Sequence, residues 1–245
     1  MRAVFSECVV TVFMKILGVD SSANAASVAI SIDGKIIAQT FSNTGLTHSQ
    51  TLLPMVEATL KTAGLTVNDI DLFAVSNGPG SFTGVRIGVS AIKGIAQPLG
   101  KECIAVSTLE AIAQPLENSG CYAVAVLDAR CNQVYTALFD CENGFTRVTE
   151  DEAITIDELG ERLKHVSKPV VLIGDGTNVA FNKLSEKLEN VRVSPASIRY
   201  QSASNVFLIA HRSCENGVSG EKPHNILPNY LRLSQAEREL KNKSK

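Results

Sequence analysis

Short apolar runs separated by polar residues mark the first part of the chain. KILGVDSS at 15–22 and DLFAVSNG at 71–78 are mostly apolar and end in polar residues, which is typical of buried strands. Apolar residues flank Asp33 and Gly34, a dipeptide that favours the type I′ turn of a β-hairpin. We therefore expect the fold to begin with strands joined by a tight turn.

Two longer segments have the period of a helix. In the segment 48–63, one helical stripe is apolar and consists of Leu52, Leu53, Val56, Leu60 and Ala63. Gly64 follows as the expected C-cap. The segment 82–97 comes directly after a glycine-rich loop, with Ser81 as its expected N-cap. Strands and helices thus alternate, which indicates an α/β fold.

The pattern of the first half returns after Gly120. YAVAVLDAR at 122–130 resembles KILGVDSS, and the strand–turn–strand pattern follows it again, so that Asp128 corresponds to Asp20. Two such β-β-β-α units indicate a duplicated fold of the actin/Hsp70/sugar-kinase (ASKHA) type, in which a nucleotide cleft lies between two lobes. An ordinary doubly wound α/β protein with a chance repeat is the alternative.

The repeat divides the chain into four parts. We expect an N-terminal lobe at 14–118, a C-terminal lobe at 119–234 and a flexible, lysine-rich tail at 235–245. Residues 1–13 precede a second methionine and are interpreted as an extension, because their apolar run VVTVF is too short for a signal peptide. No later segment reaches the roughly 18 uninterrupted apolar residues of a membrane helix, so a soluble protein is expected.

Charge and cysteine content narrow the class of protein. With 23 basic and 25 acidic residues the formal charge is −2, so this chain is not expected to hold nucleic acid by bulk electrostatics alone. None of the six cysteines forms a C-x-x-C pair or joins a histidine at zinc-finger spacing. Free thiols in a reducing compartment are expected, which predicts a cytoplasmic protein.

The glycine-rich loop around Gly78 and Gly80 fits neither common phosphate-binding pattern. Counting from either glycine fails to give G-x-x-x-x-G-K-[ST], and Gly84 comes one residue too late for G-x-G-x-x-G. Backbone N–H groups at a helix N-terminus can still bind an anion. A tight turn with ordinary capping is the favoured interpretation.

Small residues line one side of the helix that follows. Gly84, Gly88 and Ala91 lie at helical spacing, and glycine inside a helix is about 0.5–1 kcal/mol less favourable than alanine. Close approach of another backbone would compensate. That neighbour is either this chain's own core or a partner. The adjacent helix 48–63, with the adaptable Met55, favours one face on the sheet and the other on a partner.

Candidate catalytic chemistry is sparse. Asp20 and Asp128 are placed to act on a metal-bound nucleotide, but side chains such as Ser21 replace the glycines that let phosphates approach a hairpin. The two aspartates are better explained as turn caps. No Ser/His/Asp series and no paired histidine ligands occur, so no catalytic residue and no metal ligand are assigned. The residues of the expected degenerate nucleotide cleft are Asp20, Ser21, Asp128, Gly174 and Gly176.

The chain resembles the bacterial TsaB (YeaZ) family from about Met14 to Arg232. The resemblance rests on six segments that occur in the family's order: ILGVDSS, HSQTLLPMV, GPGSFTGVRIGVSAIKGIA, VSTLEAIA, LDARCNQVY and PNYLR. GPGSFTGVRIG followed by VSTLEA is the specific signature, which the sister TsaD branch shares only in a looser form. The metal-binding sister carries two histidines one turn apart, where this chain has His48 and Leu52.

The resemblance implies a non-catalytic subunit in the synthesis of threonylcarbamoyladenosine on tRNA. In the family, TsaD transfers the threonylcarbamoyl group, TsaB pairs with it, and the ATPase TsaE joins them. The pairing implied is a bundle of the helices at 48–63 and 82–97 with their counterparts, and TsaB alone forms a homodimer through similar surfaces. The partner-binding residues so implied are His48, Leu52, Met55, Val56, Ser81, Phe82, Thr83, Gly84, Arg86, Gly88 and Ala91.

The resemblance also implies that this chain holds no cofactor of its own. ATP or ADP and metal belong to the partner subunits, tRNA is reached through the complex, and no membrane is involved. Two enzymatic alternatives stay open: an ASKHA-type ATP-binding enzyme that uses Asp20 and Asp128, and a glycoprotease-like peptidase. The missing phosphate glycines argue against the first. The missing metal-ligand pair and nucleophile argue against the second.

Overall fold

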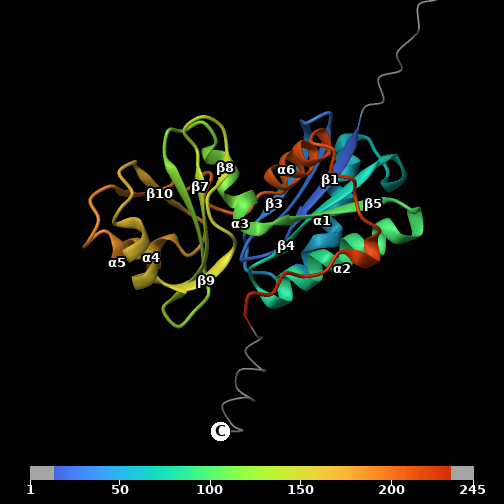
Figure 1. Ribbon diagram of the computed structural model, residues 1–245. Helices are drawn as coiled ribbons and strands as arrows, with labels where there is room; N and C mark the ends of the chain where they lie inside the picture. Colours follow the sequence, from blue (N-terminus) through green and yellow to red (C-terminus); the bar gives the residue numbers. More distant parts are fainter. Residues whose placement is uncertain (1–13, 233–245) are drawn as a thin grey trace, which may run out of the picture.

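The computed structural model describes residues 14–232; the expected extension 1–13 and tail 235–245 lie outside this range. Two sheets stand side by side (Figure 1). The first has the order β3-β2-β1-β4-β5. Its strands are β1 (Lys15–Asp20), β2 (Ala26–Ile32), β3 (Lys35–Ser42), β4 (Leu72–Gly78) and β5 (Glu102–Ser107).

The second sheet repeats this plan with the order β11-β10-β6-β7-β8, and β9 also pairs with β7. In each sheet the first strand in sequence is antiparallel to the second and parallel to the next strand after a helix. The predicted duplication is therefore confirmed. The strands are β6 (Tyr122–Asp128), β7 (Gln133–Asp140), β8 (Thr146–Arg147), β9 (Glu152–Thr155), β10 (Val170–Ile173) and β11 (Val191–Val193).

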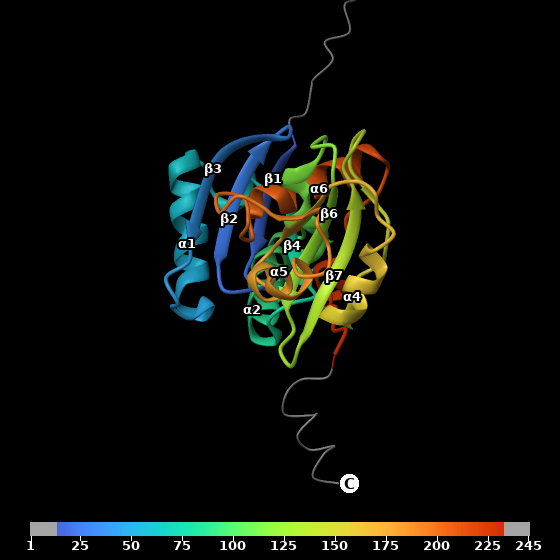
Figure 2. The same ribbon diagram turned by 90° about the vertical axis from the view of Figure 1, so that its left-hand side faces the viewer.

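Helices cover both faces of each sheet. Apolar side chains of α1 and α2 pack on one face of the first sheet, and Figure 2 shows α1 along β2 and β3. Side chains of α4 and α5 pack in the same way on the second sheet. The helices are α1 (His48–Ala63), α2 (Phe82–Leu99), α3 (Thr108–Ala113), α4 (Ile156–Leu163), α5 (Thr177–Leu184) and α6 (Ala203–Glu215), with 3-10 turns η1 (Val67–Asp69), η2 (Gln114–Leu116) and η3 (Pro223–Asn225).

The remaining two helices are exchanged between the sheets. The helix α3 follows β5 in sequence, but Leu109 and Ile112 pack against the second sheet. The helix α6 follows β11, but Val206 and Phe207 pack against the first sheet. The predicted lobe boundary between residues 118 and 119 stays a prediction. The helix α6 belongs to the C-terminal lobe by chain order but packs on the sheet of the N-terminal lobe.

Local signals in the sequence placed several elements correctly. Asp33 and Gly34 have φ of 47° and 73°, which fits the expected I′ turn between β2 and β3. Gly64 is left-handed and ends α1, as expected. The second predicted helix runs two residues further than expected, through Pro98 to Leu99, and Gly100 caps it. Its N-cap is Ser81, whose hydroxyl accepts from Gly84 N.

Candidate functional site

The glycine-rich loop after β4 is packed against the chain's own β1–β2 loop. Ser81 N donates a hydrogen bond of 2.6 Å to Ser22 O. A side chain on Gly80 would overlap the same carbonyl oxygen, so glycine is required by the close backbone approach. The loop is thus a turn that seats the start of α2.

Gly84 and Gly88 face the same β1–β2 loop. The Ser21 hydroxyl donates to Gly84 O at 2.9 Å. A Cβ on Gly88 would lie 2.6 Å from Ser21 Oγ, and one on Gly84 would overlap Ser21 O. The predicted close approach is real, but its partner is this chain. Both glycines are therefore removed from the expected partner-binding surface.

The outer sides of α1 and α2 form an open groove of about 530 Å³. We call it the docking groove. Leu53 on α1 is 53% exposed, and Ile87 and Ala91 on α2 are half-buried beside it. Of the predicted partner-binding residues, six line it. The full lining is His48, Ser49, Leu52, Leu53, Phe82, Thr83, Arg86, Ile87, Ser90 and Ala91.

Three further assignments made from sequence need correction. Met55 and Val56 are only 7% and 4% exposed, because they pack in the core between α1 and the first sheet. Leu53, expected on one apolar stripe with Leu52, is exposed, whereas Leu52 is buried at the base of the groove. Sequence reasoning missed Leu53 and Ile87 as residues of the groove.

His48 fixes the start of α1 to the β1–β2 loop. Its Nε2 lies 2.6 Å from Ala23 O. A carbonyl oxygen only accepts, so Nε2 carries the proton and donates. His48 is therefore engaged in a structural hydrogen bond at the edge of the groove.

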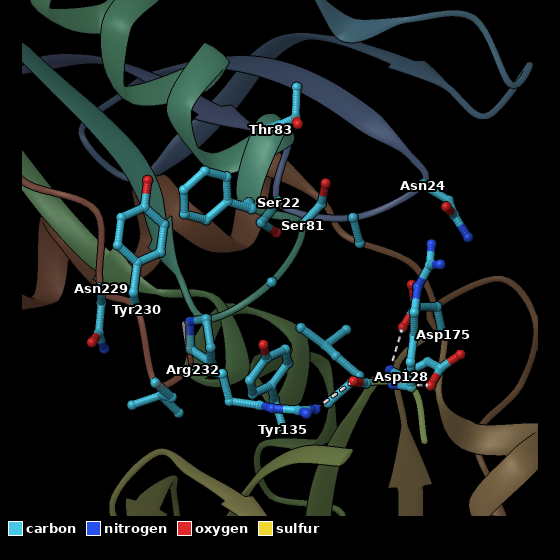
Figure 3. A pocket seen from close by; sticks show the side chains of 18 residues that line it. Ser22, Asn24, Ser81, Thr83, Asp128, Tyr135, Asp175, Asn229, Tyr230 and Arg232 are labelled. Carbon is cyan, nitrogen blue, oxygen red and sulfur yellow. Dashed lines mark hydrogen bonds between the residues drawn. The ribbon is translucent and has the colours of Figure 1, made fainter. Parts of the chain in front are cut away.

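A second hollow of about 610 Å³ lies between the lobes, where β1 and β6 end (Figure 3). Exposed polar side chains line it, Ser81 among them. Phe82 and Thr83 line both this interlobe cleft and the docking groove. The cleft lining is Ser22, Ala23, Asn24, Pro79, Gly80, Ser81, Phe82, Thr83, Leu127, Asp128, Ala129, Arg130, Tyr135, Asp175, Asn229, Tyr230, Leu231 and Arg232.

The two corresponding aspartates have different surroundings. Asp20 is fully buried, and its carboxylate accepts hydrogen bonds from Ser22 N, the Ser22 hydroxyl and the Ser76 hydroxyl. Burial raises its pKa, although these hydrogen bonds act in the opposite direction. Asp128 lines the cleft, and its Oδ1 accepts from Arg130 N. Both carboxylates thus accept hydrogen bonds in their own turns, as the capping interpretation requires.

The remaining predicted cleft residues lie beneath its surface. A Cβ on Gly176 would come within 2.9 Å of Asp128 N, and Gly174 has φ of 119° and abuts Val126. These glycines and Ser21 serve backbone packing and do not line the cleft. Asp175, which sequence reasoning missed, accepts a hydrogen bond from Asp128 N. Burial and then the nearby Asp128 charge raise the Asp175 pKa.

No cluster of three or more His, Cys, Asp or Glu within residues 14–232 is placed to hold a metal ion. None of the helices described there is long and apolar enough to cross a membrane.

The fold and the sequence both match known proteins. The structure of YeaZ from Pseudomonas aeruginosa superposes with a TM-score of 0.75 and 25% identity, covering 89% of this chain and 100% of that one. The family model described as "TsaD: tRNA N6-adenosine threonylcarbamoyltransferase" matches residues 37–240. The Escherichia coli "tRNA threonylcarbamoyladenosine biosynthesis protein TsaB" is 39% identical over 167 residues, which are 66% of this chain and 72% of the relative. The chain belongs to the TsaB (YeaZ) family.

A more distant structure shows that the fold of this TsaB family member extends beyond the family. Component A of the Acidaminococcus fermentans (R)-2-hydroxyglutaryl-CoA dehydratase superposes with a TM-score of 0.50 at 14% identity. The superposition covers 82% of this chain and 99% of the component A chain. Together with the repeated sheet order, this confirms the predicted ASKHA-type fold.

Proposed function

We propose that the chain is a cytoplasmic, non-catalytic subunit that binds and supports a TsaD-type threonylcarbamoyltransferase in tRNA N6-threonylcarbamoyladenosine modification. Membership of the TsaB family supports the pathway, since the E. coli relative is named for it. The docking groove carries the proposal, because it leaves apolar side chains of two helices without a neighbour among residues 14–232.

The form of the groove fits a partner with the same fold. The TsaD family model matches most of this chain, including both helices α1 and α2. A TsaD-type subunit therefore has a comparable helix pair, and two such pairs pack as a four-helix bundle. In its absence a second copy would present the same surface, which gives a homodimer with two-fold symmetry. A TsaE-type ATPase and tRNA join through the complex.

The β1–β2 loop supports the non-catalytic part of the proposal. In an ASKHA enzyme this loop cradles nucleotide phosphates, but here Ser22 O and the Ser21 hydroxyl are hydrogen-bonded to the start of α2. Asp20, which would face a metal, is buried under its own turn. These residues do not fit a nucleotide, and we assign ATP or ADP and metal to the partner subunits. Calorimetry should then detect no micromolar ATP binding to the isolated chain.

Binding to the TsaD-type partner tests the proposal. Leu53→Arg places a charge in the groove at an exposed position, so the monomer should keep its melting temperature while affinity falls about tenfold or more. Val179→Arg is the matched control, because Val179 is an exposed apolar residue on α5 of the other lobe. Size-exclusion chromatography and calorimetry of the mixed proteins give both values.

Three results would contradict the proposal. The first is wild-type protein that fails to associate with the partner. The second is equal loss of binding in Leu53→Arg and the Val179→Arg control. The third is an unchanged amount of threonylcarbamoyladenosine in tRNA after deletion of the gene, measured by mass spectrometry of nucleosides.

A further inference from the structure

The last described residues cross the molecule from one lobe to the other. We call residues 226–232 the latch. On the first lobe, Asn77 Nδ2 donates to Leu227 O at 3.0 Å, and Asn229 N donates back to Asn77 O at 2.7 Å. On the second lobe, the Arg232 guanidinium donates to Ala129 O at 2.6 Å (Figure 3). The latch is thus fixed at both ends, on opposite sides of the interlobe cleft.

Tyr230 lies between these anchors and contacts the first turns of α2. Its ring stacks on the Phe82 ring with centroids 4.7 Å apart and planes 26° from parallel. Arg86 Nε donates to the Tyr230 hydroxyl at 2.7 Å. The Arg86 guanidinium carbon also lies 3.9 Å from the centre of the Phe82 ring, which is cation–π geometry. The three side chains therefore hold one another in a single arrangement.

Phe82 and Arg86 are both part of the docking groove. Long side chains on an exposed helix face otherwise sample several rotamers, and ordering them on binding weakens affinity. Tyr230 removes this freedom before a partner arrives. Tyr230 itself does not line the docking groove. It lines the interlobe cleft instead.

We propose that Tyr230 is a positioning residue for the docking groove: anchored by the latch, it holds Phe82 and Arg86 in the orientation that the partner subunit meets. The inference rests on the proposed function of the groove. A merely structural role is a poor fit to Tyr230, since its side chain is 40% exposed and the latch has backbone anchors on either side of it.

The test compares Tyr230→Ala, Tyr230→Phe and Leu227→Ala in the full chain. Calorimetry measures the dissociation constant for the TsaD-type partner, and thermal unfolding measures stability. Tyr230→Ala should weaken binding about tenfold at an unchanged melting temperature. Tyr230→Phe keeps the ring stacking and should recover most of that loss. Leu227→Ala removes an exposed side chain of the same segment and should bind like wild type.

A double-mutant cycle separates positioning from direct contact. If Tyr230 acts through the stacked Phe82 ring, Tyr230→Ala should have little further effect on affinity in the Phe82→Ala background. Wild-type binding together with unchanged binding of Tyr230→Ala overturns this inference and leaves the proposed function standing. A melting temperature of Tyr230→Ala that falls together with its affinity also overturns it. Absence of binding by the wild type refutes the proposed function itself.

Discussion

A methyl group added to each of three glycines of α2 should change stability in three different ways. Apart from the backbone of α2 itself, no atom of residues 14–232 lies within 4 Å of the position of a Cβ on Gly94, so Gly94→Ala should stabilise the fold by about 0.5–1 kcal/mol through helix propensity alone. At Gly84 the new methyl group overlaps the Ser21 backbone carbonyl, which cannot rotate away. Overpacking of this kind destabilises by about 1–3 kcal/mol, which exceeds the helix gain.

Gly88→Ala should lie between these two variants. Its Cβ would come within 2.6 Å of the Ser21 hydroxyl oxygen but only within 3.5 Å of Val75 Cγ2. The hydroxyl has to rotate, and the hydrogen bond to Gly84 O is lost, at about 1 kcal/mol. The helix gain roughly offsets this loss, so a change near zero is expected.

Urea unfolding of the four proteins, followed by circular dichroism, measures the series. The expected order of stability is Gly94→Ala, wild type and Gly88→Ala close together, then Gly84→Ala. Equal stabilisation by all three substitutions would refute the close approach of α2 to the β1–β2 loop. Weaker partner binding by Gly88→Ala at unchanged stability would return this glycine to the docking surface.

Two further substitutions test contacts elsewhere in the fold. Burial raises the pKa of Asp20, so the folded state favours the protonated acid, and this stabilisation is lost as the pH rises through the raised pKa. Asp20→Asn cannot ionise and does not undergo this loss. The melting temperature of Asp20→Asn minus that of the wild type should therefore increase between about pH 4 and neutral pH. A difference that stays constant over this range would contradict the raised pKa. Arg147 bonds Asp151 at 2.7 Å and Glu110 at 2.9 Å. Arg147→Met should lower the free energy of unfolding, measured by urea unfolding, by about 1–3 kcal/mol. An unchanged free energy would show that water replaces Arg147 as the partner of both carboxylates at no cost.

Signals confined to neighbouring residues were readable from the sequence. The Asp33–Gly34 turn, the left-handed Gly64 and the Ser81 cap follow from the conformations that these residues prefer, and all three are present. The correspondence of Asp20 and Asp128 was also visible, because both end the first strand of a repeated unit.

Long-range contacts were not readable in the same way. A small-residue stripe shows that something approaches α2, but not that Gly84 and Gly88 meet Ser21, which is distant in sequence. Adjacent leucines lie about 100° apart on a helix, and periodicity did not decide that Leu53 faces outward. The contact of Tyr230 with α2 depends on where the chain returns after α6, which no local pattern specifies.

One contact links the interlobe cleft to the docking groove. The β1–β2 loop of an ASKHA enzyme needs free backbone groups and small residues to hold phosphates. Here the glycines lie on α2 instead, and Ser21 of the loop occupies the space beside Gly84 and Gly88. Because α2 rests directly on the loop, Ser22 O and the Ser21 hydroxyl are hydrogen-bonded to the start of this helix. This packing also determines which side of α2 stays uncovered. The uncovered side forms the groove together with α1 and includes Thr83, Ile87 and Ala91. The absence of a nucleotide and the docking role that we propose for this chain thus rest on the same packing of α2 against the β1–β2 loop.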